Sequence, residues 1–235
     1  MSRVLQESNI NTRLKNRYII LNENYFSYID TEFKAYILGF IYADGFVGIH
    51  DDFCISLCDT NDNYKILKRF KEELQTDCEI KHSHNNYNKG IYIFKFSNKT
   101  IVNNLNKCGV HTCKSLDMKD IPHNIDNNLI NHFIRGYFDG DGSIFSYLDT
   151  YDNRQRYCME IIGTEEFLSI INKIISEKCS IKQTRLHNVN RVPGLTRISY
   201  KGVDSLIKIR EFLYKNATIY LTYKFERFRN ISPYS

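Results

Sequence analysis

Two aspartates, Asp44 and Asp141, lie 97 residues apart, and each is followed by a glycine. Each ends an apolar stretch that predicts a helix, over about 31–43 and about 128–140. If these helices pack together, both carboxylates come to one end, where the helix dipoles are also negative. Two such charges need a proton or a cation, and Mg²⁺ binds one or two carboxylates together with substrate phosphates. A single Asp-Gly pair commonly does no more than end a helix, but the duplication favours a metal site.

Small residues in the same two stretches indicate how the helices would pack. Gly39 and Ala43 are four residues apart, as are Gly136 and Gly140, so each pair occupies one helical face. Side chains this small let two helix backbones approach closely. The glycine after each aspartate is expected to adopt the left-handed conformation and to end its helix.

The similarity between the two segments extends into a duplicated unit of about 100 residues. Each unit is predicted to contain a helix, two strands, a helix, two strands and a final helix. The expected strands are about 46–50, 53–58, 78–84 and 91–96, then about 143–148, 156–162, 179–186 and 195–200. The pattern predicts an α+β protein with two pseudo-symmetric α-β-β-α-β-β-α repeats and the aspartate-bearing helices at its centre. The expected divisions are an N-terminal extension (1–24), a first repeat (25–110), a linker (111–127) and a second repeat (128–235).

The two aspartate segments read ILGFIYADG at 37–45 and IRGYFDGDG at 134–142. With the lead-in IDTEFKAY at 29–36, they resemble the paired motifs of the LAGLIDADG homing endonucleases in their single-chain form. Both acids are present, while Leu38, Tyr42 and Arg135 depart from the motif. The resemblance covers about residues 25–230 and implies a saddle of two four-stranded antiparallel sheets astride double-stranded DNA.

The resemblance also implies an activity, that of a metal-dependent DNA endonuclease. Such an enzyme hydrolyses phosphodiesters of both strands across the minor groove and leaves short 3′ overhangs. Asp44 and Asp141 would bind metal, one for each strand cut, and the backbone carbonyls of Ala43 and Gly140 would complete the coordination. The expected cofactor is Mg²⁺ or Mn²⁺, whereas Ca²⁺ would bind without supporting cleavage. The expected partner is a long, pseudo-palindromic or asymmetric duplex, bound by an intron-encoded monomer.

Two lysines are further candidates for the catalytic centre. Family members often place a lysine near each scissile phosphate, and Lys114 and Lys224 occupy late positions of the two repeats. Their role would be to position water or to neutralise phosphate charge. An ordinary surface lysine explains each position equally well.

Alternation along the predicted strands indicates which side chains would meet DNA. In 91–96, Tyr92 and Phe94 share a face that is expected to pack on helices, and Ile93 and Lys95 share the other. The second face would enter the major groove, where Arg and Lys either contact guanine or hold phosphates. The candidates for this surface are Lys81, His82, His84, Lys95, Arg154, Arg156, Lys182, Arg185, Arg191 and Arg197.

Composition and charge agree with a polyanionic partner. The 235 residues carry a net charge of +5, but residues 178–230 alone have 12 Lys and Arg against 3 Asp and Glu. No stretch of the sequence approaches the ~20 apolar residues of a membrane span, and the N-terminal residues lack the apolar core of a signal peptide. Seven scattered cysteines without a CxxC pair argue against a zinc site. We therefore expect reduced thiols in a cytoplasmic or organellar protein that is neither secreted nor bound to a membrane.

Two other functions are compatible with the same fold. An intron RNA maturase would use the basic surface to bind RNA and help its host intron to splice. A catalytically inactive DNA-binding regulator would keep the fold without the chemistry, although the two intact aspartates weigh against it. If DNA is the partner, binding is expected to weaken steeply as the salt concentration rises.

Overall fold

The duplicated unit is present in the structure, a computed structural model that describes residues 19–112, 117–189 and 192–231. The first unit contains α1 (Glu32–Asp44), β1 (Gly45–Val47), β2 (Asp52–Cys58), α2 (Asn61–Leu74), β3 (Ile80–His84), β4 (Gly90–Ser97) and α3 (Lys99–Lys107). The second contains α5 (Ile130–Asp141), β5 (Gly142–Leu148), β6 (Gln155–Gly163), α6 (Glu165–Cys179), β7 (Leu186–Asn188), β8 (Thr196–Lys201) and α7 (Val203–Tyr214), followed by α8 (Thr222–Arg229). This order confirms the predicted α+β class with two α-β-β-α-β-β-α repeats.

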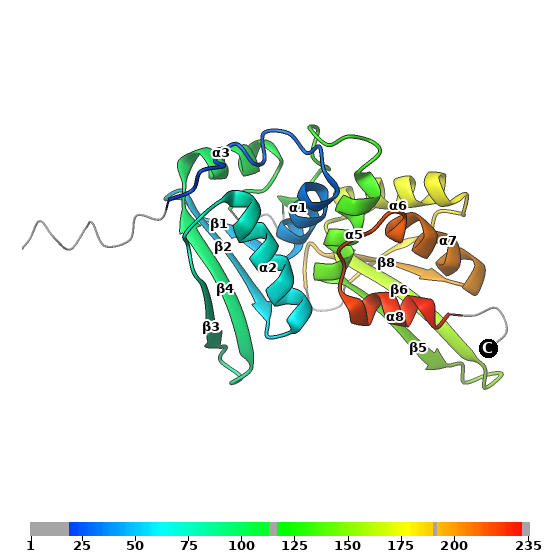
Figure 1. Ribbon diagram of the computed structural model, residues 1–235. Coiled ribbons are helices and arrows are strands. Elements are labelled where there is room, and N and C mark those ends of the chain that lie inside the picture. The colour runs from blue at the N-terminus through cyan, green and yellow to red at the C-terminus, as the bar shows by residue number, and fades with distance from the viewer. Residues whose placement is uncertain (1–18, 113–116, 190–191, 232–235) are drawn as a thin grey trace, which may run out of the picture.

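Each unit folds its four strands into one antiparallel sheet. The strand order is β1-β2-β4-β3 in the first sheet and β5-β6-β8-β7 in the second. The motif helices α1 and α5 lie side by side between the two sheets (Figure 1). Along β2, Phe53, Ile55 and Leu57 are buried against the helices, and the residues between them are more exposed on the opposite side. We call this second side of each sheet its open face.

Polar side chains define where several helices begin. Thr31, Thr60, Asn98 and Thr164 are the N-caps of α1, α2, α3 and α6, and each side-chain oxygen accepts a hydrogen bond from the backbone N–H three residues later. Caps of this kind typically stabilise a helix by about 1 kcal/mol. Equivalent threonines cap α2 and α6, which shows the duplication again at the level of helix ends.

The strand predicted at 179–186 is wrong, because β7 comprises only Leu186–Asn188. Ser180 is left-handed (φ 51°) and ends α6. Thr184 then donates its N–H to Oδ1 of Asn172 (3.3 Å) and accepts from Nδ2 of the same side chain (2.8 Å). Because a buried side chain occupies the backbone groups of Thr184, that residue has no place in the strand ladder.

The described part of the N-terminal extension packs on the first repeat. Ile20 is buried and forms a β-bridge with Thr76, and Tyr25 and Phe26 follow it into the core. Through Ile20, residues 19–24 therefore contribute to the same hydrophobic core as the repeat that follows them. None of the described helices is both long enough and apolar enough to cross a membrane.

Candidate active site

Helices α1 and α5 meet along the small residues of the two motifs. A Cβ atom on Gly39 would lie 2.0 Å from the carbonyl oxygen of Phe133, and one on Gly136 would lie 1.9 Å from that of Tyr36. Phe133 and Tyr36 are themselves equivalent positions of the two repeats, 97 residues apart. The contact is therefore pseudo-two-fold symmetric, and neither glycine has room for a side chain.

The last turns of these helices bring the two aspartates to the same end of the contact. A Cβ atom on Gly140 would lie 2.2 Å from Cβ of Ala43 and 3.1 Å from Oδ2 of Asp44, so the Asp44 carboxylate lies against the other helix. Asp44 and Asp141 are both exposed. Burial raises the pKa of the Tyr137 hydroxyl, and both carboxylates raise it further, which places them near one side chain. We call Asp44 and Asp141 the acidic centre.

The glycines that follow the aspartates are extended, so the predicted left-handed conformation is wrong. Gly45 has φ −77° and Gly142 has φ −96°. Glycine is needed there for space, because a Cβ atom would lie 2.6 Å from Cγ2 of Ile41 in one repeat and 2.1 Å from Cδ2 of Phe138 in the other. Each helix therefore continues directly into the first strand of its sheet, with the aspartate at the junction.

Lys224 is buried against the end of α5. Its Nζ donates to the carbonyl oxygens of Phe138 (2.7 Å), Asp139 (2.7 Å) and Gly142 (2.6 Å). These bonds use all three donors of the ammonium group and place its charge at the negative end of the helix dipole. Burial lowers its pKa to about 8, although nearby carboxylates act in the opposite direction. The placement favours a structural role; contact with a phosphate stays a prediction, and Lys114 lies outside the described residues.

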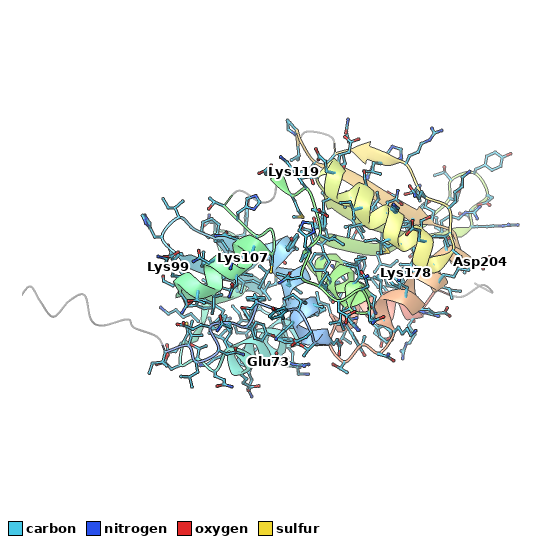
Figure 2. All side chains as sticks on the ribbon, turned by 90° about the horizontal axis from the view of Figure 1, so that it is seen from above. Glu73, Lys99, Lys107, Lys119, Lys178 and Asp204 are labelled. Carbon is cyan, nitrogen blue, oxygen red and sulfur yellow. The ribbon has the colours of Figure 1, made fainter. Side chains whose placement is uncertain are left out.

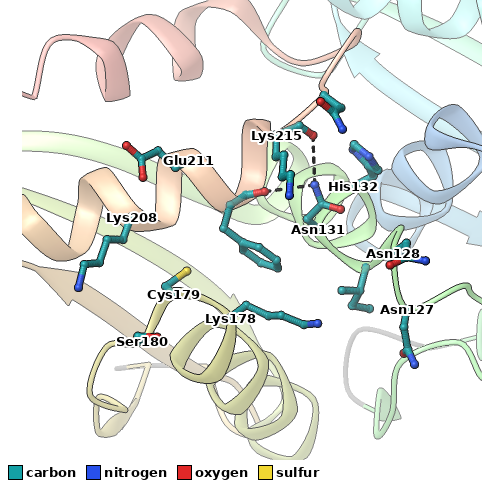
Figure 3. A pocket seen from close by; sticks show the side chains of 13 residues that line it. Asn127, Asn128, Asn131, His132, Lys178, Cys179, Ser180, Lys208, Glu211 and Lys215 are labelled. Atoms are coloured by element: carbon teal, nitrogen blue, oxygen red, sulfur yellow. Dashed lines mark hydrogen bonds between the residues drawn. The ribbon is translucent and has the colours of Figure 1, made fainter.

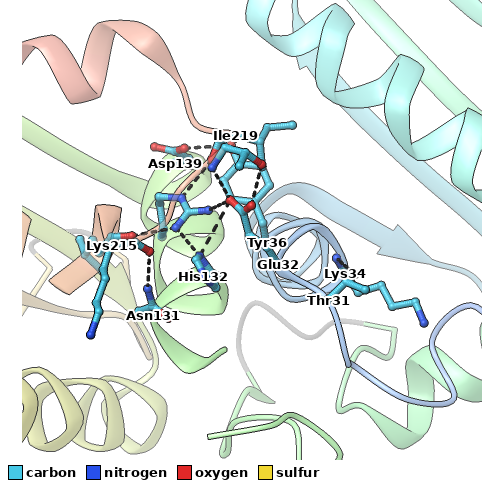
Figure 4. A network of polar contacts seen from close by, with 12 residues as sticks. Thr31, Glu32, Lys34, Tyr36, Asn131, His132, Asp139, Lys215 and Ile219 are labelled. Atoms are coloured by element: carbon cyan, nitrogen blue, oxygen red, sulfur yellow. Dashed lines mark hydrogen bonds and ion pairs between the residues drawn. The ribbon is translucent and has the colours of Figure 1, made fainter. Parts of the chain in front are cut away.

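A polar ladder on α5, formed by Asn131, Arg135 and Asp139, binds the segment that leads from α7 to α8 (Figure 4). These three residues are four apart and share one helical face. Their partners are backbone groups of Phe212, Leu213, Lys215, Ile219 and Leu221. The motif helix of the second repeat thus holds this segment at its beginning and at its end.

Glu32, at the start of α1, joins the polar ladder from the first repeat. Its Oε1 accepts from Nη2 of Arg135 (2.8 Å) and from the N–H of Thr218 (2.7 Å), and its Oε2 accepts from the Thr218 hydroxyl (2.6 Å). One turn further, the Tyr36 hydroxyl donates to Oδ2 of Asp139 at 2.8 Å. In the sequence, Arg135 is visible only as a departure from the motif. Polar residues every four positions in an apolar helix were the signal that could have revealed this network.

Two buried groups of this network have shifted pKa values. Burial raises the pKa of Asp139 to about 6. Nη1 of Arg135 lies 2.6 Å from Nδ1 of His132. Because a guanidinium group only donates, Nδ1 is the acceptor and the imidazole carries its proton on Nε2. Burial, followed by the charge of Arg135, lowers the pKa of His132 to about 4, so the ring is neutral at pH 7.

Four of the predicted DNA contacts lie on the open faces. They are Lys81 and Lys95 in the first sheet and Arg156 and Arg197 in the second. Nη1 of Arg197 lies 3.6 Å from Oε1 of Glu160, which holds the guanidinium group in place on that surface. Each open face therefore carries two of the predicted cations.

His82 and His84 lie on the helix-covered side of the first sheet, so the predicted face is wrong for both. His82 pairs with Tyr92 in the strand register, and its Nε2 lies 2.8 Å from Oδ2 of Asp59. The reason is that β3 begins with Ile80 on the helix-covered side, so the even-numbered residues of this strand share that side.

Three of the other predicted contacts, Arg154, Lys182 and Arg185, lie outside the strands. Arg154 is in the turn between β5 and β6, where its Nε lies 3.7 Å from Asp152. Lys182 and Arg185 are exposed in the segment before β7. Arg191 lies outside the described residues. Their predicted role on DNA stays a prediction.

The described cations of the basic region, residues 178–230, do not gather on a single surface. Lys178, Lys208 and Lys215 line a cavity of about 710 Å³ beside the N-terminal end of α5 (Figure 3). That end is about 17 Å from the acidic centre, because a helix rises 1.5 Å per residue. Lys178 projects on the helical side of the molecule, as do lysines of α3 (Figure 2). Positive charge is therefore divided between the open faces and the helical side.

Solved structures with this architecture include several LAGLIDADG homing endonucleases. I-SmaMI bound to cleaved DNA aligns with a TM-score of 0.59 and 13% identity over 85% of this chain and 87% of that one. I-GzeII in complex with its DNA target aligns with a TM-score of 0.58 and 14% identity, over 86% and 88% of the two chains. I-AabMI bound to uncleaved DNA aligns with a TM-score of 0.54 and 11% identity, over 86% of this chain and 89% of that one. No protein-family profile and no curated protein sequence matches the chain. The chain thus has the LAGLIDADG endonuclease fold, as the sequence resemblance implies.

Proposed function

We propose that the protein is a site-specific endonuclease that cuts both strands of a DNA duplex. The observation that carries this proposal is the acidic centre, in which two exposed carboxylates end two packed, pseudo-symmetric helices between two sheets. A duplex presents two backbones related by a local two-fold axis, so two equivalent acids match two scissile phosphates. The DNA-bound neighbours of the same fold support this assignment.

A divalent cation fits the donors that the acidic centre offers. Among the described residues, no group of three or more His, Cys, Asp or Glu side chains is arranged to hold a metal. Asp44 and Asp141, with the carbonyl groups of Ala43 and Gly140, would instead provide a partial set of hard oxygen ligands. Such a set suits Mg²⁺ or Mn²⁺, which complete their coordination with water and substrate phosphate. When bound, the cation would activate water and stabilise the leaving 3′-oxygen.

The chain itself would hold the acids and position the duplex. Direct contact between the helix backbones keeps Asp44 and Asp141 together at one end of α1 and α5. Lys224 binds the carbonyls at the end of α5 and so restrains the turn that carries Asp141. The open faces would bind the major groove on either side of the cut. This arrangement suits cleavage across the minor groove with short 3′ overhangs.

The test is selection of cleavable sites from a library of random duplexes, with Mg²⁺ present and with the cut ends sequenced. The expected product is a double-strand break with a short 3′ overhang of constant length. Asp44→Asn and Asp141→Asn are each expected to reduce double-strand cleavage by at least about 100-fold. Binding of the selected duplex in Ca²⁺ is expected to persist in both variants.

Asp204→Asn is the matched control, because Asp204 is an exposed aspartate in the first turn of α7. It should cleave like the wild type. If Asp44→Asn cleaves as fast as the wild type, the acidic centre is not catalytic. If the wild type cleaves no duplex and instead binds intron RNA, the maturase alternative replaces this proposal.

A further inference from the structure

Two aromatic side chains project from the open face of β5. Phe145 and Tyr147 are each 38% exposed, and their ring centroids are 6.3 Å apart. In the strand register they pair with Cys158 and Arg156 of β6. The preceding residue, Ile144, points to the opposite side of the sheet and is buried in the core. Nζ of Lys201, on β8, lies 5.9 Å from the Tyr147 ring. The two rings and the cations beside them therefore share one surface.

The hydrophobic core does not require these rings. The core side of the same strand pair is filled by Ile144, Met159 and Ile161, which are all buried. Two other positions of the same open face, Ser143 and Ser199, carry small polar side chains. An aromatic pair that leaves apolar area in solvent is more typical of a contact surface than of a structural element.

On a duplex, the apolar group available to such a surface is the thymine methyl. In the major groove only thymine presents a C5 methyl group, and apolar side chains such as Phe contact it. Residues i and i+2 of a strand are about 6.8 Å apart. Successive base pairs are about 3.4 Å apart along each strand. Two rings at this spacing would therefore meet bases two steps apart.

We propose that Phe145 and Tyr147 read two thymines, separated by one base, in the half-site that the second repeat binds. The inference rests on the proposed function and adds a base preference to it. Lys201, beside the Tyr147 ring, supplies positive charge that holds the neighbouring backbone, whereas Arg156 is ion-paired with Asp149 and Asp152.

The first repeat has no such pair of rings. The offset of 97 residues aligns Phe145 with Gly48 and Tyr147 with His50, and β1 ends at Val47. Phe46 is the exposed aromatic side chain of that short strand. The two half-sites are therefore expected to differ, and only the one under the second repeat should show the spaced thymine pair.

The test replaces thymine by deoxyuridine, which removes only the methyl group. Duplexes are first selected for binding in Ca²⁺, and each thymine is then replaced in turn while Kd is measured. The wild type should lose about fourfold in affinity at each of two positions separated by one base, as burial of one methyl group implies. Phe145→Ser should abolish the loss at one of these positions and Tyr147→Ser the loss at the other. Both variants should melt like the wild type.

Phe46→Ser is the matched control, because it removes an exposed ring from the other sheet. In this variant, deoxyuridine should still lower the affinity at both thymine positions by as much as in the wild type. Wild-type binding that tolerates deoxyuridine throughout the half-site would overturn the inference while leaving the proposed function intact. The same conclusion follows if deoxyuridine still lowers the affinity of Phe145→Ser and of Tyr147→Ser at both positions. If no duplex is bound specifically, the proposed function fails and this inference fails with it.

Discussion

Replacing either motif glycine by alanine tests the contact that brings the acidic centre together. Alanine favours a helix over glycine by about 1 kcal/mol, so helix propensity alone predicts that Gly39→Ala and Gly136→Ala are stabilising. The structure predicts the opposite sign. The added Cβ atoms would lie 2.0 and 1.9 Å from carbonyl oxygens of the facing helix, where real contacts stay above 3.0 Å. The helices would have to separate by about 1 Å, since backbone atoms, unlike side-chain ends, cannot rotate away.

The expected loss follows from the cost of overpacking. Forcing a core apart typically costs about 1–3 kcal/mol, and here the clash is with backbone, so we expect a net loss of about 2–3 kcal/mol in the free energy of unfolding. For a chain of this size that corresponds to a fall in Tm of roughly 4–12 °C. One separation of the helices relieves both clashes. The double variant should therefore be little less stable than either single variant.

Thermal unfolding followed by circular dichroism measures these differences directly. Asn103→Ala is the control, because Asn103 is an exposed position within α3 and should change stability by less than about 0.5 kcal/mol. A higher Tm for Gly39→Ala, or fully additive losses in the double variant, would show that α1 and α5 are not in direct backbone contact.

Three further predictions concern buried charge and salt. Because burial lowers the pKa of His132 from 6.5 to about 4, the unfolded chain binds one more proton at this residue between these values, so the contribution of His132 to stability should fall as the pH drops from 6.5 to 4. The raised pKa of Asp139 acts in the opposite direction over much of this range, so the measurement is the difference between the wild type and His132→Asn. In pH-dependent melts the variant should gain roughly 2–3 kcal/mol relative to the wild type as the pH falls from 6.5 to 4. Lys224→Met removes three hydrogen bonds to carbonyl oxygens at the end of α5 and should destabilise the protein by about 2 kcal/mol. Lys208→Met, at an exposed lysine, should not, and equal melting of the two variants would contradict the structural role of Lys224. Affinity for a selected duplex should fall at least about tenfold between 50 and 200 mM salt in a titration of Kd, and an unchanged Kd would argue against a polyanionic partner.

Local sequence pattern determined the architecture of this protein. Apolar stretches of helical length, alternating strands and the 97-residue offset were sufficient to predict two α-β-β-α-β-β-α repeats. The four-residue spacing of Gly39 and Ala43, and of Gly136 and Gly140, also indicated which faces of the motif helices could meet. These features depend on side-chain size and periodicity within one element, which the sequence displays directly.

Register and strand limits were decided by contacts between elements. His82 and His84 take their face from the pairing of β3 with β4, and the short β7 follows from the capture of Thr184 by Asn172. Gly45 is extended, and glycine is required there because the side chain of Ile41, in the preceding turn, occupies the space that a Cβ atom would need. The order of residues along each strand does not contain this information, since it depends on which partner lies opposite.

The burial of Arg135 and Lys224 depends on the tertiary structure alone. Arg135 is buried because Glu32 and backbone carbonyls some 80 residues later in the chain satisfy its donors, and Lys224 is buried because three carbonyls at the end of α5 do the same. In the sequence each is one more basic residue that would ordinarily lie at the surface. The sequence by itself determined two repeats with an aspartate at the end of each motif helix. Only the folded chain decided that Arg135 and Lys224 are buried, because a charge can be buried only where distant parts of the chain supply its partners.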